Sequence, residues 1–219
     1  MRSMKNAFQL IVPKTPGQER YAQILKSPKP ITIATGPAGS GKTLLVVQEA
    51  VNCFKTTDIH KIVLTRPTLP TDEDIGYLPG TLEEKLNPWM RPIYDCLQHS
   101  YSESQIRRLI DDKEIEIAPL AFMRGRTFHN CFIIADEMQN STSGQMKMLL
   151  TRIGYNTKMV VTGDLEQSDR EGINGLENLL SHMEMINIDD LEYLEHAQLE
   201  NEDVRRHPAV REILNLYRK

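Results

Sequence analysis

Several features common in other protein classes are missing from this sequence, and each absence narrows its class. No apolar run approaches the roughly 18 residues that a membrane span requires, so no membrane partner is expected. Residues 1–9 lack the apolar core of a signal peptide. The three cysteines are odd in number and lack the spacing of metal ligands, and the six histidines add no such pattern. Reduced, mostly buried thiols in a cytoplasmic protein are therefore expected.

An overall basic charge is also absent. The net charge is −4, so any contact with nucleic acid has to come from a local patch. Internal repeats and low-complexity segments are absent as well. A chain of 219 residues with 40% hydrophobic and 26% charged residues is typical of a soluble globular protein with one large domain or two small ones.

The chain is organised around a glycine-rich stretch that fits the phosphate-binding loop G-x-x-x-x-G-K-[ST]. It follows a β-branched run at residues 31–34 and precedes a helix-like run at 44–51, which is the context that the motif requires. Its backbone N–H groups and the helix dipole favour a bound phosphate. Lys42 is expected to reach the β- and γ-phosphates of ATP, and the Thr43 hydroxyl to hold Mg²⁺. The alternative is a glycine-rich turn that fits by chance. The stretch consists of Gly36, Pro37, Ala38, Gly39, Ser40, Gly41, Lys42 and Thr43.

A second acidic motif follows another apolar strand. The apolar residues 132–135 are followed by Asp136 and Glu137, which occupy the Walker B position of a phosphate-loop protein. Asp136 is expected to complete the Mg²⁺ shell and Glu137 to orient or deprotonate the attacking water. A pair of this kind favours hydrolysis over transfer to a bound acceptor. The alternative is an exposed acidic turn.

Two glutamines are further candidates. Gln167 follows a Gly-Asp turn after a predicted strand, so it is expected near the γ-phosphate if that strand lies beside the Walker B strand. The alternative is a polar turn residue. Gln18 lies on a predicted helix and has the donor and acceptor needed to pair with adenine, although the sequence alone favours a solvated side chain.

Strands and helices alternate along the chain, which predicts a single doubly wound α/β core with a mostly parallel sheet. Residues 1–17 are expected to be a leader, and residues 67–113 an irregular, partly helical insertion. The expected strands lie at 31–35, 61–65, 114–118, 131–135 and 158–162, with a short one at 185–188. The expected helices lie at 18–26, 44–55, 81–99, 103–111, 175–182, from Ser141 or Thr142 to 153, and after Pro208.

Taken together, these motifs resemble the PhoH family of ATPases, whose RecA-like core is related to the N-terminal half of superfamily 1 helicases. Met138 stands where the family usually has alanine. The resemblance implies ATP hydrolysis and action on RNA or single-stranded DNA by a ring, with a hexamer favoured. The compact chain is what a phage-encoded member would look like. The matching stretches are 76–85, 92–95, 119–127, 136–140, 150–154, 163–164 with Gln167, and 203–208.

Arginines complete the list of candidates. A cation is needed at the γ-phosphate, and a single core predicts that a neighbouring subunit supplies it. Arg124 and Arg126 are candidates for this arginine finger, but Arg152 and Arg206 are favoured. Arg152 could instead cap its helix, and Arg206 could pair within its own chain. Arg66, Arg124 and Arg126 follow predicted strands, so they are expected at the carboxyl edge of the sheet, where they could bind nucleic-acid phosphates.

Two other functions are compatible with the same motifs. One is a phosphate-loop kinase of a small molecule, against which the acidic pair and Gln167 argue. The other is a non-enzymatic ring that nucleotide only stabilises, against which the complete set of Lys42, Thr43, Asp136 and Glu137 argues.

Overall fold

The computed structural model describes residues 11–67, 82–169, 172–186, 190–205 and 209, with the backbone alone for 82–89. The expected loop at 68–80 and the expected helix after Pro208 lie outside these residues, apart from Ala209. No helix within the described ranges is both long and apolar enough to cross a membrane.

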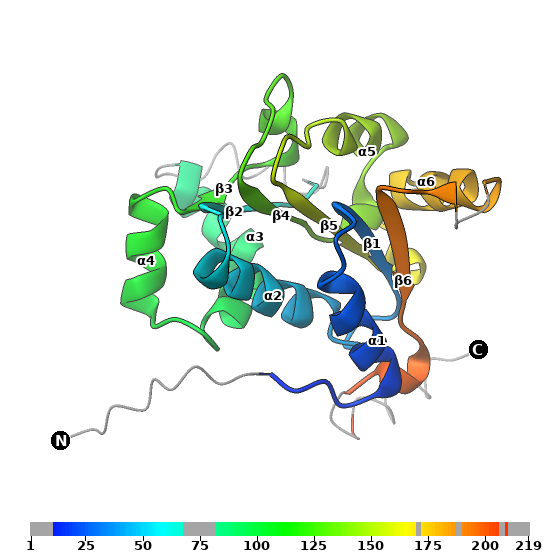
Figure 1. Ribbon diagram of the computed structural model, residues 1–219, viewed down its shortest axis with the longest axis horizontal. Coiled ribbons are helices and arrows are strands. Elements are labelled where there is room, and N and C mark those ends of the chain that lie inside the picture. Colours follow the sequence, from blue (N-terminus) through cyan, green and yellow to red (C-terminus); the bar gives the residue numbers. More distant parts are fainter. Residues whose placement is uncertain (1–10, 68–81, 170–171, 187–189, 206–208, 210–219) are drawn as a thin grey trace.

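A six-stranded sheet, parallel throughout, forms the centre of the molecule (Figure 1), in the order β3-β2-β4-β5-β1-β6. The interior strand β4 is buried along its whole length, which explains its uninterrupted apolar sequence. The carboxyl ends of all strands meet at one edge, where ligands bind in folds of this type. The strands are β1 (Ile31–Thr35), β2 (Lys61–Thr65), β3 (Ile115–Ile117), β4 (Cys131–Ala135), β5 (Lys158–Gly163) and β6 (Leu194–Gln198).

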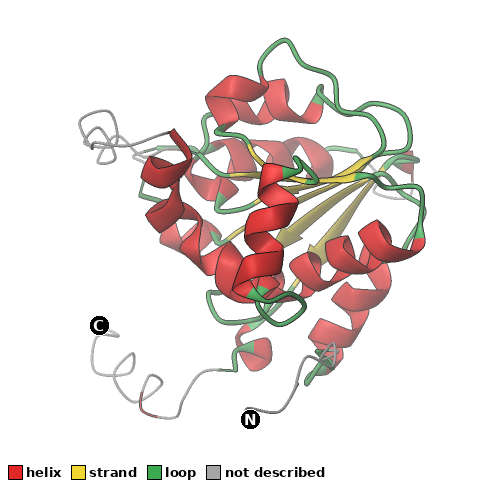
Figure 2. Ribbon diagram, turned by 90° about the vertical axis from the view of Figure 1, so that its left-hand side faces the viewer, coloured by secondary structure: helices red, strands yellow, loops and turns green. Residues whose placement is uncertain are grey.

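Helices cover both faces of the sheet (Figure 2), and each face has its own apolar core. One core takes side chains from α1 (Pro16–Leu25), α2 (Lys42–Thr56), α3 (Leu82–Leu97) and α4 (Glu103–Asp111). The other takes them from α5 (Ser143–Leu150) and α6 (Gly175–Glu184). Alternate residues of each interior strand point into the two cores, so that Ile134 faces the first and Ile133 the second.

Most predicted elements are confirmed, including the α5 cap, where the Thr142 side chain accepts a hydrogen bond from the backbone of Gln145. One strand was predicted in the wrong place. The strand was expected at 185–188, of which residues 187 and 188 lie outside the described residues, and Met185 caps the end of α6. The sixth strand of the sheet is β6, which pairs with β1. Its sequence, Leu-Glu-His-Ala-Gln, contains no β-branched residue. Pairing with β1 therefore outweighs local propensity.

Candidate nucleotide-binding site

The phosphate-binding loop connects the end of β1 to the start of α2. Gly41 caps α2 with a left-handed backbone, at φ 93°. Gly36 also has a positive φ, and a Cβ atom there would lie 2.4 Å from the carbonyl oxygen of Leu199. A larger residue at position 36 would push the loop away from the end of β6, so this glycine lets the two segments pack together.

The structure brings the loop and the end of β4 together. Thr43 Oγ1 donates a hydrogen bond to Asp136 Oδ1 over 3.0 Å, and Thr162 Oγ1 of the intervening strand β5 donates to the same oxygen over 2.5 Å. Lys42 Nζ curls back to the carbonyl oxygens of Gly36, at 2.6 Å, and Pro37, at 3.0 Å. A hydroxyl, a carboxylate and an ammonium therefore surround the mouth of the loop.

The pair Thr43 and Asp136 fits a magnesium ion in its chemistry. Mg²⁺ prefers hard oxygen ligands and is usually held by one or two protein groups together with substrate phosphates and water. Among the described residues, no group of three or more His, Cys, Asp and Glu side chains is placed to hold a metal.

Glu137 directly follows Asp136 and has an unusual backbone, with φ 56° and ψ 36°. A non-glycine residue in this left-handed region costs about 1–3 kcal/mol, and such residues cluster at functional sites. Its Oε1 atom lies 3.4 Å from Arg66 Nη2, and its Oε2 atom accepts a hydrogen bond from Gln139 over 2.6 Å. Arg66 also approaches Asp136, with Nε 3.8 Å from Oδ2. Arg66 thus lies at the carboxyl edge, as expected, but its side chain is engaged by the acidic pair.

The turn after β5 contacts the phosphate-binding loop through a residue that the sequence reasoning missed. Asp164 Oδ2 accepts a hydrogen bond from the backbone N–H of Ala38 over 2.8 Å. β5 lies beside β4, which is the condition on which the expected position of Gln167 depended. Gln167 is exposed, and its backbone carbonyl oxygen lies 3.4 Å from Gln139 Nε2. The Gly-Asp pattern indicated the turn and the PhoH resemblance covered Asp164, but neither indicated that its carboxylate contacts the phosphate-binding loop.

Gln18 is buried and braces the loop. Its Nε2 atom donates to the carbonyl oxygens of Ser40, at 2.9 Å, and Asp203, at 3.2 Å, and its Oε1 atom accepts from the N–H of Lys14. Both amide hydrogens are therefore in use, and pairing with adenine would require these bonds to break. The surface position that the sequence favoured for Gln18 is wrong.

The segment that follows β6 also reaches the loop. The backbone N–H of Arg205 donates to the carbonyl oxygen of Gly39 over 3.1 Å. Asp203 is buried and accepts a hydrogen bond from Thr15 Oγ1 over 2.5 Å. Burial alone would raise the pKa of Asp203, but hydrogen bonds from Thr15 and from backbone amides lower it below its ordinary value. Arg206 lies outside the described residues.

Arg152 lies where β4 and β5 begin, at the edge opposite to the loop. It follows α5, and its guanidinium donates to the carbonyl oxygens of Met148 and Arg126 and to the hydroxyl of Thr151. In this chain it therefore caps its helix. A role as arginine finger for a neighbouring subunit stays a prediction.

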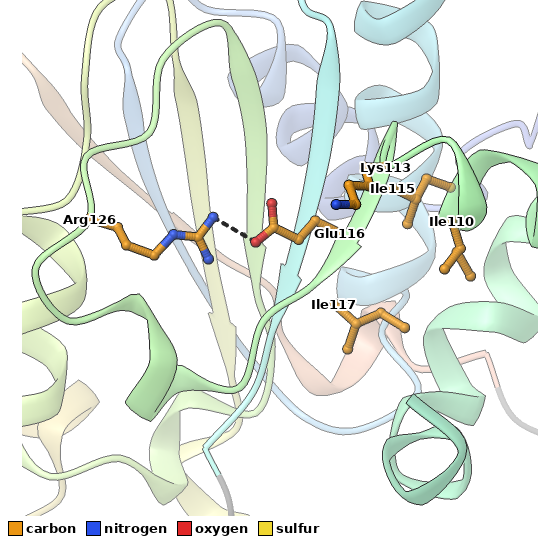
Figure 3. A pocket seen from close by; sticks show the side chains of 6 residues that line it. All are labelled: Ile110, Lys113, Ile115, Glu116, Ile117 and Arg126. Atoms are coloured by element: carbon orange, nitrogen blue, oxygen red, sulfur yellow. Dashed lines mark ion pairs between the residues drawn. The ribbon is translucent and has the colours of Figure 1, made fainter. Parts of the chain in front are cut away.

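The remaining arginines differ in position. Arg124 is exposed on the loop after β3. The expectation that Arg126 lies at the carboxyl edge is wrong, because the chain turns back through a short 3₁₀ helix (Leu120–Met123). Arg126 forms a 2.6 Å ion pair with Glu116 of the edge strand β3, and both line a pocket of about 350 Å³ (Figure 3). Strand β3 is four strands from β1 in the sheet, about 19 Å at the usual strand spacing.

A parallel α/β sheet with a phosphate-binding loop after one interior strand and an acidic pair after another is the fold of a P-loop NTPase. The chain belongs to the PhoH family, because the family described as "PhoH-like protein" matches residues 10–218.

Relatives in several bacteria support this assignment. A PhoH-like protein of Mycobacterium leprae (strain TN) is 44% identical over 210 residues, which cover 94% of this chain and 58% of the relative. One from Bacillus subtilis (strain 168) is 44% identical over 208 residues, 94% of this chain and 63% of the relative. The chain thus spans less than two thirds of the length of these relatives.

Among solved structures, the chain is similar to the crystal structure of Pif1 helicase from Candida albicans, with a TM-score of 0.46 and 15% identity. The similarity covers 94% of this chain and 43% of that one.

Proposed function

We propose that this protein binds ATP together with Mg²⁺ and hydrolyses it. The observation that carries the proposal is the 3.0 Å hydrogen bond between Thr43 and Asp136, which joins the phosphate-binding loop to the acidic pair. A kinase or a purely structural nucleotide site would not require a second carboxylate, Glu137, next to this position.

Each residue has a separate part in the reaction. Lys42 leaves the loop carbonyls and binds the β- and γ-phosphates, and the loop amides bind the phosphate oxygens. Thr43 and Asp136 would hold Mg²⁺, which would neutralise charge on the phosphates. Glu137 orients the attacking water and accepts its proton. The site therefore favours attack by water over transfer to a second substrate.

We further propose that hydrolysis is coupled to RNA or single-stranded DNA, and that the protein works as a ring of identical subunits, with a hexamer favoured. Arg124 and Phe122 support a nucleic-acid surface, because both are exposed on the loop after β3. In a ring, Arg152 or Arg206 of one subunit would complete the site of the next.

Release of phosphate from radiolabelled ATP tests the proposal directly, with separation of products by thin-layer chromatography. Wild-type protein is expected to release inorganic phosphate, faster with single-stranded RNA or DNA at low salt. Lys42→Ala should lose nucleotide binding, while Glu137→Gln should keep binding and lose turnover by about 100-fold or more. Lys147→Ala, which removes an exposed lysine from α5, is the control and should behave as wild type.

Four results would contradict parts of this proposal. Label transferred to an acceptor would make the protein a kinase. Equal rates with and without polynucleotide would remove the coupling to nucleic acid. A native mass equal to one subunit would remove the ring. Nucleotide binding without turnover would support the non-enzymatic alternative.

A further inference from the structure

The carboxylate of Glu137 is oriented by a neighbour with no role in the proposed chemistry so far. Gln139 Nε2 donates to Glu137 Oε2 over 2.6 Å, which is a short contact for an amide and a carboxylate. Arg66 lies near the other oxygen, at 3.4 Å. The Glu137 side chain is 40% exposed, whereas Gln139 is only 1% exposed. The buried amide is therefore the more rigid of the two groups.

Gln139 itself is fixed by the turn that follows β5. Its Oε1 atom accepts a hydrogen bond from the backbone N–H of Asp164 over 3.1 Å. This bond settles which end of the amide faces Glu137, because a flipped amide would point N–H groups at the N–H of Asp164. The turn also packs directly on the amide, since a Cβ atom at Gly163 would lie 2.8 Å from Gln139 Oε1.

The same turn touches the phosphate-binding loop. Asp164 accepts a hydrogen bond from the N–H of Ala38 through its carboxylate and donates one to Gln139 through its backbone N–H. A continuous set of hydrogen bonds thus leads from the loop, through Asp164 and Gln139, to Glu137. A phosphate that takes the Ala38 N–H has to displace the Asp164 carboxylate, because two anions cannot share one donor at this distance.

We propose that Gln139 is the positioning residue for Glu137. Through Asp164 and Gln139, phosphate binding at the loop is coupled to the position of the Glu137 carboxylate, which activates water. The inference rests on the proposed ATP hydrolysis. Gln139 touches neither nucleotide nor water in this scheme, so it acts only through Glu137. Its loss should therefore lower kcat and leave nucleotide affinity unchanged.

The sharpest variant is Gln139→Glu. It keeps the shape of the side chain and an acceptor for the Asp164 N–H, but it replaces the donor that faces Glu137 with a negative oxygen. The matched control is Gln145→Glu. Gln145 closes a capping box at the start of α5, where glutamate serves equally well, so the control makes the same chemical change without touching Glu137.

We expect kcat of Gln139→Glu to fall at least about 10-fold, with KM for ATP and the Kd of a fluorescent ADP analogue within about two-fold of wild type. In a Glu137→Gln background the same substitution should have no further effect, because its target is already lost. Gln145→Glu should match wild type in every measurement.

Unchanged kcat in Gln139→Glu would overturn the inference while the proposed hydrolysis stands. So would an equal loss in the Glu137→Gln background, since Gln139 would then act independently of Glu137. If Gln139→Glu does not fold, Gln139→Leu is measured in the same way, and failure of both to fold would make Gln139 a purely structural residue. Absence of turnover in the wild type would overturn the proposed function together with this inference.

Discussion

Asp164 occupies a hydrogen-bond donor of the phosphate-binding loop, and its replacement by asparagine should strengthen nucleotide binding. The carboxylate is buried, at 6% exposure, and lies 2.8 Å from the N–H of Ala38. A hydrogen bond to a charged group contributes about 1.5–3 kcal/mol. Asparagine has one side-chain oxygen, which is needed for the N–H of Glu166, so its NH2 group would face Ala38 and the bond to the Ala38 N–H would be lost. Loss of this bond leaves the nucleotide about 1.5–3 kcal/mol less to overcome, which corresponds to about 10- to 150-fold tighter binding.

Asparagine is the right substitution because Asp164 also caps a short 3₁₀ helix, by accepting a hydrogen bond from the N–H of Glu166. Asparagine serves as well as aspartate in a cap, so the turn should keep its shape. The affinities for ADP and for a non-hydrolysable ATP analogue can be measured by calorimetry at fixed Mg²⁺ and salt.

The control is Glu166→Gln, which removes one negative charge from an exposed position in the same turn. An equal gain in affinity in both variants would show that overall charge is responsible, and direct competition for the Ala38 N–H would be refuted. Unchanged or weaker binding in Asp164→Asn would refute the reasoning altogether.

Three further predictions concern other parts of the molecule. Gly17→Ala should destabilise the protein by about 1–3 kcal/mol in urea unfolding, because its Cβ atom would lie 2.1 Å from the carboxylate of Asp203. Burial lowers the pKa of His196 from 6.5, so the unfolded chain takes up a proton that the folded one resists. The melting temperature should therefore fall as the pH drops below about 6.5, and less steeply in His196→Gln. Arg126→Gln should cost less than about 1 kcal/mol, because its ion pair with Glu116 is partly exposed, and it should leave ADP affinity unchanged.

Much of the fold could be predicted from the sequence because local signals and tertiary structure agree. Strand β4 is a continuous apolar run that is buried on both faces, and the glycine spacing of the loop, between a strand and a helix, is specific to phosphate binding. The pairing of Thr43 with Asp136 follows from the topology, since both lie at the carboxyl edge of neighbouring parts of the sheet.

What the sequence could not reveal depends on contacts between distant segments. β6 has weak strand propensity and exists because β1 offers it a partner. Gln139 and Asp164 lie in stretches that resemble the family, and Gln18 was a candidate on its helix, but none of these signals indicated a contact. The contacts depend on which N–H or carbonyl groups the fold places beside each side chain. Arg126 was misplaced because a single 3₁₀ turn reversed the direction of its loop.

The two flanks of the phosphate-binding loop have a mechanical consequence. Gln18 of helix α1 donates a hydrogen bond to the carbonyl oxygen of Ser40 in the loop. The backbone N–H of Arg205, in the segment after β6, donates one to the carbonyl oxygen of Gly39. Arg205 contacts the loop through this backbone hydrogen bond, and its guanidinium donates a second one to the carbonyl oxygen of Lys14, just before α1. A displacement of Arg205 would therefore strain the phosphate-binding loop and the segment before α1 together.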